Sequence, residues 1–451
     1  MMKPIFYLVL IFAYFSWHVL GDDQNEKDSG EEENGGAFYC FLVRNTCDKI
    51  DLYSELDPYK NLSCTHMVYG FAIVDSTNWT VSPSWWDTQE VEEWEGNNTA
   101  VTSLHESSNM SILLGIYNDG NLSFIDSPES RENFAKEVVK SARQHGFQGI
   151  FFYFKSSQHF EDPQFLDFLV SLKKELDIDA EDSNRLQVVI SIEPKHFERS
   201  HEVFPNIVPY FDGFYLLSDD TPSSERNDIA FQVNPLFPST LNQTIVPEET
   251  ISVIAEDLVD NLIPRDKLII GLSVWANSFV LEDPNLAGHG EKVITKVKDS
   301  VTGRNDGKLA YFEICGLKNS SDIVYDSTAE TTSFSAEGLW FSLNVPGHES
   351  FEKKLKWIEE NKFGGVGLTS LKADDKDGVC GEGPFPVHRY VGEQLQRSQS
   401  ISESEDNNNK APACTRICII RPEDTPSGFS FSNIETRWCS HIVLSSAKIL
   451  V

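Results

Sequence analysis

The chain is short of positive charge: 37 lysine and arginine residues stand against 70 aspartate and glutamate residues, which gives a formal net charge of −33. Nucleic acids and anionic membranes are bound through basic surfaces, so we expect neither as a partner. The negative charge selects no ligand, because neutral glycans, cationic proteins and simple solubility are all compatible with it.

Metal-binding patterns are also missing. The chain has eight cysteines, but no spacing among them resembles the paired CxxC motifs of a zinc site. In an oxidising compartment such cysteines are better explained as disulfide partners. We therefore predict neither a metal site nor a cofactor.

Long apolar runs are lacking beyond residue 21, so no later segment is suited to spanning a bilayer. Residues 1–21 have the layout of a secretory signal, with Lys3 as the positive start, a mostly apolar run from Ile5 to Val19, and the small Gly21 for cleavage. The alternative is an uncleaved anchor, for which the run is short. We expect a secreted, extracellular protein without a membrane anchor.

Asn-x-Ser/Thr sequons fit secretion, because each is a candidate acceptor for an N-linked glycan. Such sequons also arise by chance, so these residues are candidates only. The seven sequons begin at Asn61, Asn78, Asn97, Asn109, Asn121, Asn242 and Asn319.

Apolar runs recur along the chain, each of a length typical of a buried strand. They begin at Ala37, His66, Ser111, Gly149, Leu186, Phe214, Lys267 and Gly364. Helical patterns lie between them: residues 127–145 begin with a Ser and a Pro and carry acids in the first turn. Eight strands that alternate with helices over about 360 residues predict an α/β fold, a parallel (β/α)8 TIM barrel with an insertion.

Polar segments flank this region. Residues 22–36 are acidic and glycine-ended, which is typical of a disordered spacer, because such a segment cannot bury a core. Residues 396–412 are polar again and are typical of a linker. The predicted barrel therefore occupies residues 37–395.

Residues 413–451 repeat the beginning of the barrel. CIIR at Cys418 and RWCSHIVLSSAKI after it match CFLVR at Cys40 and LSCTHMVYGFAIV, so that Cys439 corresponds to Cys64. We interpret this segment as the first two strands of a truncated second barrel repeat. Some thirty residues cannot form such a barrel, so either the sequence is a fragment or the segment packs elsewhere.

Four segments follow one another along the chain: CTHMVYGFA at the second strand, the helix leading into the fourth strand, LAYFEIC, and FGGVGLTSLKADDKDGVCGEGPFPV. Together, and in this order, they resemble glycoside hydrolase family 18, the family of animal chitinases and chitinase-like lectins. LAYFEIC resembles the motif of that family's insertion domain, and the last segment resembles its last strand and disulfide loop. The resemblance implies a small α+β insertion at about residues 282–345, between the seventh strand and the last helices.

The resemblance also implies two disulfides, one between Cys40 and Cys64 and one between Cys315 and Cys380. Both would stabilise the fold. The other four cysteines have no assigned partner; they are Cys47, Cys414, Cys418 and Cys439.

Active members of the family carry FDGxDxDWE on the fourth strand, where the Glu protonates the leaving oxygen and the nearest Asp orients the N-acetyl nucleophile of the substrate. Here residues 147–155 are FQGIFFYFK. Gln148, Phe151 and Tyr153 replace the three Asp, and Lys155 replaces the Glu. A lysine of ordinary pKa, about 10.4, is too weak an acid for this step. We therefore predict that the chain has no catalytic residue of the family mechanism.

Other groove positions differ from the family pattern too. Trp275 stands at the tyrosine of the seventh strand, and Thr369 replaces the tryptophan that floors the central sugar subsite. Asp220 is kept from the sixth-strand motif. Trp86, after the second strand, is either part of a sugar platform or a packing residue.

Two further predictions concern charge in the barrel mouth. We expect Lys155 to form an ion pair with Asp220 or Asp219, because buried charges are paired. Glu193, at the end of the fifth strand, is either a relocated acid or a solvated loop carboxylate.

We therefore predict a secreted chitinase-like protein without hydrolase activity, which binds chitin-type or other N-acetylglucosamine-containing glycans like a lectin, or acts as a signalling factor. One alternative is a hydrolase with an acid rebuilt around Glu193 or Asp220. Another is an extracellular structural glycoprotein whose groove has no ligand. The sequence does not indicate the oligomeric state.

Overall fold

The computed structural model describes residues 36–43, 56–75, 77–82, 96–118, 120–154, 158–181, 183–194, 204–218, 228–239, 247–283, 289–298, 300–302, 304, 306–317, 323–409, 417–420 and 441–444. All eight strands expected from the apolar runs are present. They are β1 (Ala37–Val43), β2 (His66–Asp75), β4 (Ser111–Asn118), β5 (Gly149–Phe154), β6 (Gln187–Ile192), β7 (Gly213–Leu216), β8 (Leu268–Ser273) and β15 (Gly365–Thr369).

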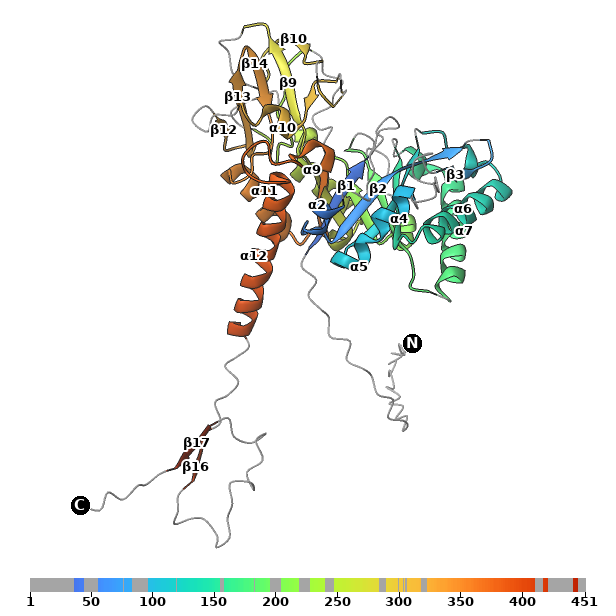
Figure 1. Ribbon diagram of the computed structural model, residues 1–451. Coiled ribbons are helices and arrows are strands. Elements are labelled where there is room, and N and C mark those ends of the chain that lie inside the picture. Colours follow the sequence, from blue (N-terminus) through green and yellow to red (C-terminus); the bar gives the residue numbers. More distant parts are fainter. Residues whose placement is uncertain are drawn as a thin grey trace, which may run out of the picture. The chain divides into compact units, whose positions relative to one another are not determined.

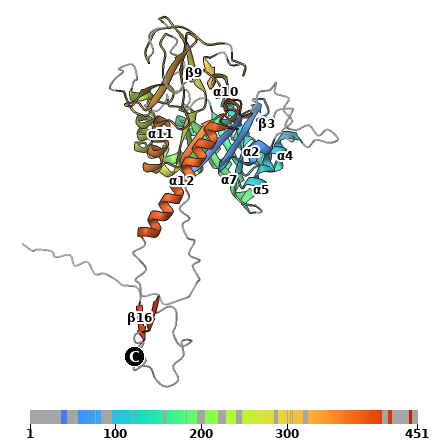
Figure 2. The ribbon, with the colours of Figure 1, turned by 60° about the vertical axis from the view of Figure 1, so that its left-hand side comes forward.

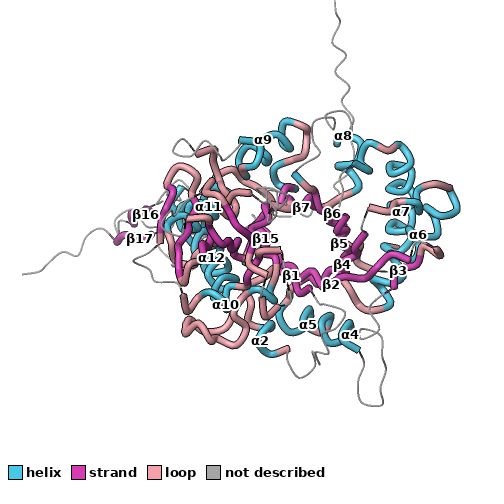
Figure 3. Tube along the Cα trace, turned by 90° about the horizontal axis from the view of Figure 1, so that it is seen from above, coloured by secondary structure: helices cyan, strands magenta, loops and turns pink. Residues whose placement is uncertain are grey.

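These eight strands form a closed parallel barrel. β1 pairs with both β2 and β15, which joins the two ends of the sheet. Figure 3 shows the resulting ring of strands from above, with helices outside it. A short strand, β3 (Thr80–Ser82), pairs antiparallel with the end of β2 and extends the sheet beyond the barrel. The prediction of a TIM barrel is confirmed.

Helices cover the outside of the barrel. The longer ones are α6 (Pro128–Gln144), α7 (Pro163–Ala180), α9 (Ile251–Asp260), α11 (Glu349–Glu360) and α12 (Pro386–Asn409). The shorter ones are α2 (Asp57–Lys60), α4 (Gly96–Thr102), α5 (Leu104–Ser108) and α8 (Phe204–Ile207), whereas α10 (Tyr311–Ile314) lies in the insertion described below. α6 begins where the sequence predicted, because the Ser127 hydroxyl accepts the N–H of Ser130 and Pro128 needs no partner at the first helical position. α12 lies beside α11 (Figure 2), and the rings of Phe351 and Tyr390 pack between them with their centroids 5.5 Å apart.

An insertion lies between β8 and β15 (Figure 1). Its sheet has the order β10-β9-β14-β13-β12, and β11 also pairs with β9. A small core of Phe231, Phe279 and Trp340 packs on one face of this sheet. Its strands are β9 (Ala276–Leu281), β10 (Val293–Lys296), β11 (Lys308–Leu309), β12 (Val324–Asp326), β13 (Thr331–Ala336) and β14 (Leu339–Ser342).

Both disulfides implied by the family resemblance are present. Cys40 and Cys64 join β1 to the segment before β2, with their Cα atoms 6.0 Å apart. Cys315 and Cys380 join the end of α10 to the loop before α12, with their Cα atoms 5.7 Å apart. A bond that closes a long loop removes conformational freedom from the unfolded chain, so the second bridge helps to hold the insertion on the barrel.

The C-terminal repeat forms two paired strands, β16 (Ile417–Ile420) and β17 (His441–Leu444). They are parallel, and Ile417 lies opposite His441. In the barrel, Tyr39 lies opposite His66. The two pairs therefore have the same register when Cys418 is matched to Cys40. The limits of the predicted domains stay predictions.

Two properties of the described part of the chain bear on the expected partners. None of its helices is long and apolar enough to cross a bilayer. No group of three or more His, Cys, Asp or Glu residues within it is arranged to hold a metal ion.

A buried polar network connects the insertion and α11 to the barrel. The Lys354 amine donates to Asn344 Oδ1 at 2.7 Å, and Asn344 Nδ2 donates to Asn234 Oδ1 at 3.0 Å. Asn234 then bonds both strand ends at the top of the barrel: it accepts the N–H of Ser273 at 2.8 Å and donates to the carbonyl oxygen of Ser218 at 2.7 Å. The ends of β7 and β8 are thus held by one buried asparagine.

Lys354 makes stability depend on pH. Burial lowers the pKa of this fully buried amine from 10.5 to about 7, and the charge of Glu330 opposes the shift only in part. Between these values the unfolded chain binds more protons than the folded one. We therefore expect the free energy of unfolding to rise with pH across this window, by up to about 1.4 kcal/mol per pH unit. Below pH 7 the amine is protonated in both the folded and the unfolded chain, so the stability gained by its deprotonation is absent.

Urea unfolding of Lys354→Met and of the wild type, measured across that window, tests this expectation. Lys356→Met is the matched control, because Lys356 lies on the same helix with a largely exposed side chain. The pH dependence should weaken in Lys354→Met and persist in Lys356→Met. Equal slopes in all three proteins would contradict the expected titration.

Candidate functional site

The carboxyl ends of the eight barrel strands form the mouth, which is where TIM barrels place their sites. The structure brings Phe151 and Tyr153 into the barrel from β5. Glu193, Trp275 and Thr369 lie at the ends of β6, β8 and β15. Four other predicted residues lie outside the described residues: Trp86, Lys155, Asp219 and Asp220. The ion pair predicted for Lys155 therefore stays a prediction.

Gln148 joins two strands at the other end of the barrel. Its Oε1 accepts the N–H of Ile112 at 2.9 Å, and its Nε2 donates to the carbonyl of Gly146 at 2.7 Å. Asp212 makes the equivalent contact before β7, where its carboxylate accepts the N–H of Val188 at 2.7 Å. The side-chain oxygen at position 148 therefore has a structural role that an amide fulfils as well as a carboxylate does.

Phe151 fills the centre of the barrel and is fully buried. Its ring meets Phe41 edge-on, with the centroids 5.2 Å apart, and Tyr215 at 5.6 Å. Phe41 and Tyr215 also meet edge-on at 4.9 Å. This mutual packing leaves an apolar interior that would strongly disfavour a charged carboxylate at position 151.

Tyr215 requires glycine on two neighbouring strands. A Cβ atom added to Gly367 would lie 2.3 Å from the Tyr215 ring. One added to Gly271 would lie 2.4 Å from the carbonyl oxygen of Leu216 and 2.8 Å from the Tyr215 hydroxyl oxygen. Real Cβ contacts are never so short, so both positions must stay without a side chain while the ring lies across them. The glycines of β8 and β15 thus make room for the aromatic core of the barrel.

Three half-buried rings lie above this core: Phe71 from β2, Tyr117 from β4 and Tyr153 from β5. We call them the aromatic floor. Tyr153 lies 5.9 Å from Tyr117 in a stacked arrangement and 5.0 Å from Phe71. In the strand register Tyr117 is opposite both Tyr153 and Ile73, and Ile73 is 54% exposed. The aromatic floor thus extends from the barrel interior to the exposed apolar side chain of Ile73.

The chain matches the family model for glycosyl hydrolases family 18 over residues 38–374. The chain belongs to glycosyl hydrolase family 18.

The family contains relatives of different kinds. The chain is 26% identical over 418 residues to the chitinase-like protein C25A8.4 of Caenorhabditis elegans, covering 92% of this chain and 36% of that protein. It is 24% identical to an endochitinase of Brugia malayi, covering 80% and 72% of the two chains. It spans only 15% of probable chitinase 10 of Drosophila melanogaster. The chain therefore covers a minor part of the first and the last of these relatives.

Solved family 18 structures share the fold. The second catalytic domain of a chitinase from Ostrinia furnacalis superposes with a TM-score of 0.68 at 18% identity, covering 81% of this chain and 97% of that one. Human YKL-39, described as a pseudo-chitinase with retained chitooligosaccharide binding, superposes with a TM-score of 0.66 at 20% identity, covering 80% and 100%. Chitinases and a pseudo-chitinase thus share this barrel, so the fold by itself leaves activity open.

Three predicted groove residues of this family 18 chain differ in exposure. Thr369 is 9% exposed, and its carbonyl oxygen accepts the N–H of Val274 at 3.1 Å. Trp275 is 7% exposed, and the Arg304 guanidinium carbon lies 4.8 Å from the centroid of its ring. Glu193 is half-buried, one residue beyond β6. Of the acids considered for a rebuilt site, Glu193 alone falls within the described residues.

Sequence reasoning missed the contribution of Phe71 and Tyr117 to the mouth. Alternation along β4 could have found Tyr117, which lies four residues after the interior Leu113. Phe71 lies three residues after the interior Val68, and a register shift in β2 brings it to the inner face, so alternation alone would not have found it. The same alternation places Tyr153 two residues after Phe151. The Arg304–Trp275 contact has no such signal, because it joins segments of different sheets.

The predicted sequons also differ in exposure. Asn97, on α4, is fully buried, whereas a glycan needs the amide outside the packed interior, so Asn97 is the least suited of the described candidates. Asn242 and Asn319 lie outside the described residues. The exposed candidates, which stay predictions, are Asn61, Asn78, Asn109 and Asn121.

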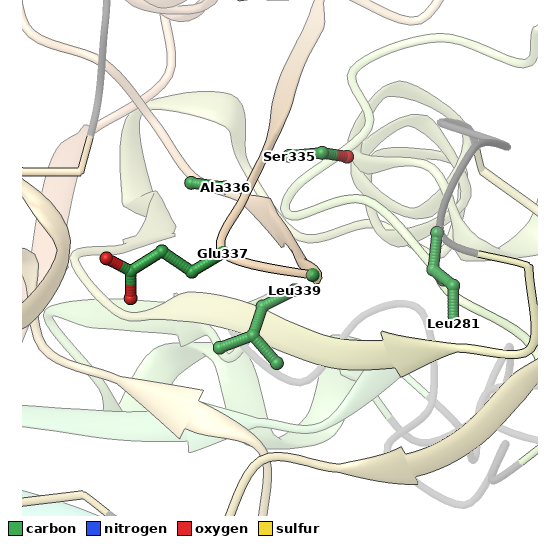
Figure 4. A pocket seen from close by; sticks show the side chains of 6 residues that line it. Leu281, Ser335, Ala336, Glu337 and Leu339 are labelled. Atoms are coloured by element: carbon green, nitrogen blue, oxygen red, sulfur yellow. The ribbon is translucent and has the colours of Figure 1, made fainter.

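A surface hollow lies on the insertion, around the turn between β13 and β14 (Figure 4). It is lined by Leu281, Ser335, Ala336, Glu337, Gly338 and Leu339. Its one charged side chain, Glu337, points outward from a turn, and the hollow belongs to the insertion and not to the barrel mouth. The arrangement offers no pair of groups for catalysis.

The aromatic core predicts the effect of restoring one lost acid. Phe151→Asp should lower the free energy of unfolding by roughly 3 kcal/mol or more, because it buries a carboxylate among Phe41 and Tyr215. Phe151→Leu is the control and should cost roughly 1–2 kcal/mol, for lost packing alone. Urea unfolding measures both. Equal losses would show that water reaches position 151.

Proposed function

We propose that this chain is a secreted, non-catalytic chitinase-like protein that binds glycans containing N-acetylglucosamine at the mouth of its barrel. The observation that carries the proposal is the aromatic floor. Two Asp positions of the family signature are held by Phe151, which packs with the rings of the barrel core, and by Tyr153, which packs with the other rings of the floor. A phenyl ring transfers no proton, and a tyrosine of ordinary pKa, about 10, is a poor proton donor near neutral pH.

The same rings support glycan binding. Aromatic faces suit the apolar faces of sugar rings, and the floor combines such faces with two tyrosine hydroxyls. YKL-39, whose fold this chain shares, is described as a pseudo-chitinase with retained chitooligosaccharide binding. The two disulfides fit an oxidising, extracytoplasmic compartment, which supports secretion.

A second candidate is a glycoprotein without a groove ligand. It is favoured by the low exposure of Trp275 and Thr369, two positions from which the family resemblance led us to expect ligand contacts. The two candidates differ in whether the mouth binds an oligosaccharide at all.

We expect no release of product from chitin oligomers. The residues that replace the acid and the positioning Asp carry no group suited to substrate-assisted hydrolysis. Mass spectrometry of the products formed from the N-acetylglucosamine tetramer tests this, with an active family 18 chitinase as positive control. Turnover that survives Lys155→Ala and is lost in Glu193→Gln would instead support the rebuilt hydrolase.

Binding should depend on the aromatic floor. We expect Tyr117→Ala to weaken the affinity for the same tetramer about fivefold, because one ring-to-sugar contact is worth roughly 1 kcal/mol. Tyr210→Ala is the matched control, since Tyr210 is also half-buried but precedes β7, at the opposite end of the barrel. Isothermal titration calorimetry measures both. The absence of any binding by the wild type would favour the glycoprotein without a groove ligand.

A further inference from the structure

We propose that Arg304 gates Trp275: its guanidinium covers the indole face at the mouth, and a glycan stacks on that face only after Arg304 has moved away. This inference rests on the proposed function, because it concerns the regulation of the same mouth.

The backbone at Trp275 is fixed at the junction of two barrel strands. Its N–H donates to the Ser273 hydroxyl at 3.1 Å, at the end of β8. The N–H of the preceding residue, Val274, donates to the carbonyl of Thr369 at the end of β15, also at 3.1 Å. The indole therefore starts from a rigid position on the mouth side of the barrel, which is the side where ligands of such barrels bind.

Arg304 reaches the indole from the insertion. Its loop leads into β11, whose residues Lys308 and Leu309 lie opposite Asn277 and Ala276 of β9. The N–H of Ser278 also donates to the carbonyl of Gly307 at 2.8 Å. These backbone contacts place residues 307–309, which follow Arg304 closely, beside the chain that leaves Trp275.

The contact with the indole is a cation–π interaction. The guanidinium carbon is 4.8 Å from the ring centroid, inside the range of about 6 Å for such contacts. The guanidinium therefore occupies the face on which a sugar ring would stack. With Arg304 in place, the indole is only 7% exposed.

Asp306 holds Arg304 in this position. The Arg304 Nε donates to Asp306 Oδ1 at 3.0 Å, and Nη2 donates to Oδ2. The arginine and aspartate side chains are 37% and 42% exposed. An ion pair as exposed as this one is weak, because water and salt screen it. Because this pair is exposed, breaking it costs little free energy, which is what a gate requires of this contact.

A closed gate lowers the apparent affinity for the ligand. The apparent Kd equals the intrinsic Kd divided by the open fraction, so removing the guanidinium should tighten binding. We expect Arg304→Ala to tighten binding of the N-acetylglucosamine tetramer about tenfold, or ~1.4 kcal/mol. Asp306→Asn, which weakens the ion pair with Arg304, should tighten it less.

Isothermal titration calorimetry on the full chain tests the gate. The set comprises the wild type, Arg304→Ala, Asp306→Asn, Trp275→Ala and the double variant Arg304→Ala, Trp275→Ala. Arg185→Ala is the matched control, because Arg185 is also partly exposed and paired with an aspartate, but it lies before β6 at the opposite end of the barrel. A thermal melt of each variant establishes that it is folded.

The gate predicts tighter binding in Arg304→Ala, no change in Arg185→Ala, and loss of the gain in the double variant. If Arg304→Ala binds the tetramer as tightly as the wild type, or more weakly, the gate is overturned and the proposed function stands. Arg304 is then either inert or itself a ligand contact. If Asp306→Asn is the only variant that folds, an affinity equal to the wild type overturns the gate. Absence of binding in every variant would overturn the gate and the proposed function together.

Discussion

The packing of Phe151 against Phe41 and Tyr215 inside the barrel is the constraint on which the mouth depends. Their rings lie 4.9 to 5.6 Å apart and close the centre of the barrel below the strand ends. Tyr215 in turn requires the glycines at positions 271 and 367, because any Cβ there would overlap its ring. One aromatic residue on β5 is therefore tied to the residue choice on four other strands.

This coupling supports the proposed absence of hydrolase activity more strongly than the replacement of one acid would. A catalytic carboxylate works only where polar neighbours set its pKa and its orientation. Around position 151 the neighbours are rings, and above it Tyr153 stacks with Tyr117. A single reverse substitution would place a charge in this apolar setting without restoring the groups that once surrounded it. The aromatic floor follows from the same replacement, since position 153 continues the face of position 151.

Much of the fold could be predicted from the sequence, because local sequence patterns determine where its strands and helices begin and end. Each barrel strand is a short apolar run, and the Ser-Pro pair before α6 marks the start of that helix. The disulfides followed from the family resemblance. The candidate site was predicted less well, since its contacts join distant segments. Nothing in the local pattern around Trp275 points to Arg304, and nothing around Asn97 shows that its amide is buried. Burial at such positions depends on tertiary packing, which periodicity does not describe.

Both the barrel and the insertion contribute residues to the mouth, and the buried polar network couples the positions of the two. Asn234 bonds the end of β7 at Ser218 and the end of β8 at Ser273, and Asn344 connects it to Lys354 on α11. Every donor and acceptor of the Asn234 amide is used, so the two strand ends cannot shift independently without leaving a buried polar group unpaired. The insertion also supplies Arg304 to the ring that follows β8. A change in how the insertion packs would thus reach the mouth by two routes, through the positions of the strand ends and through the cover on Trp275.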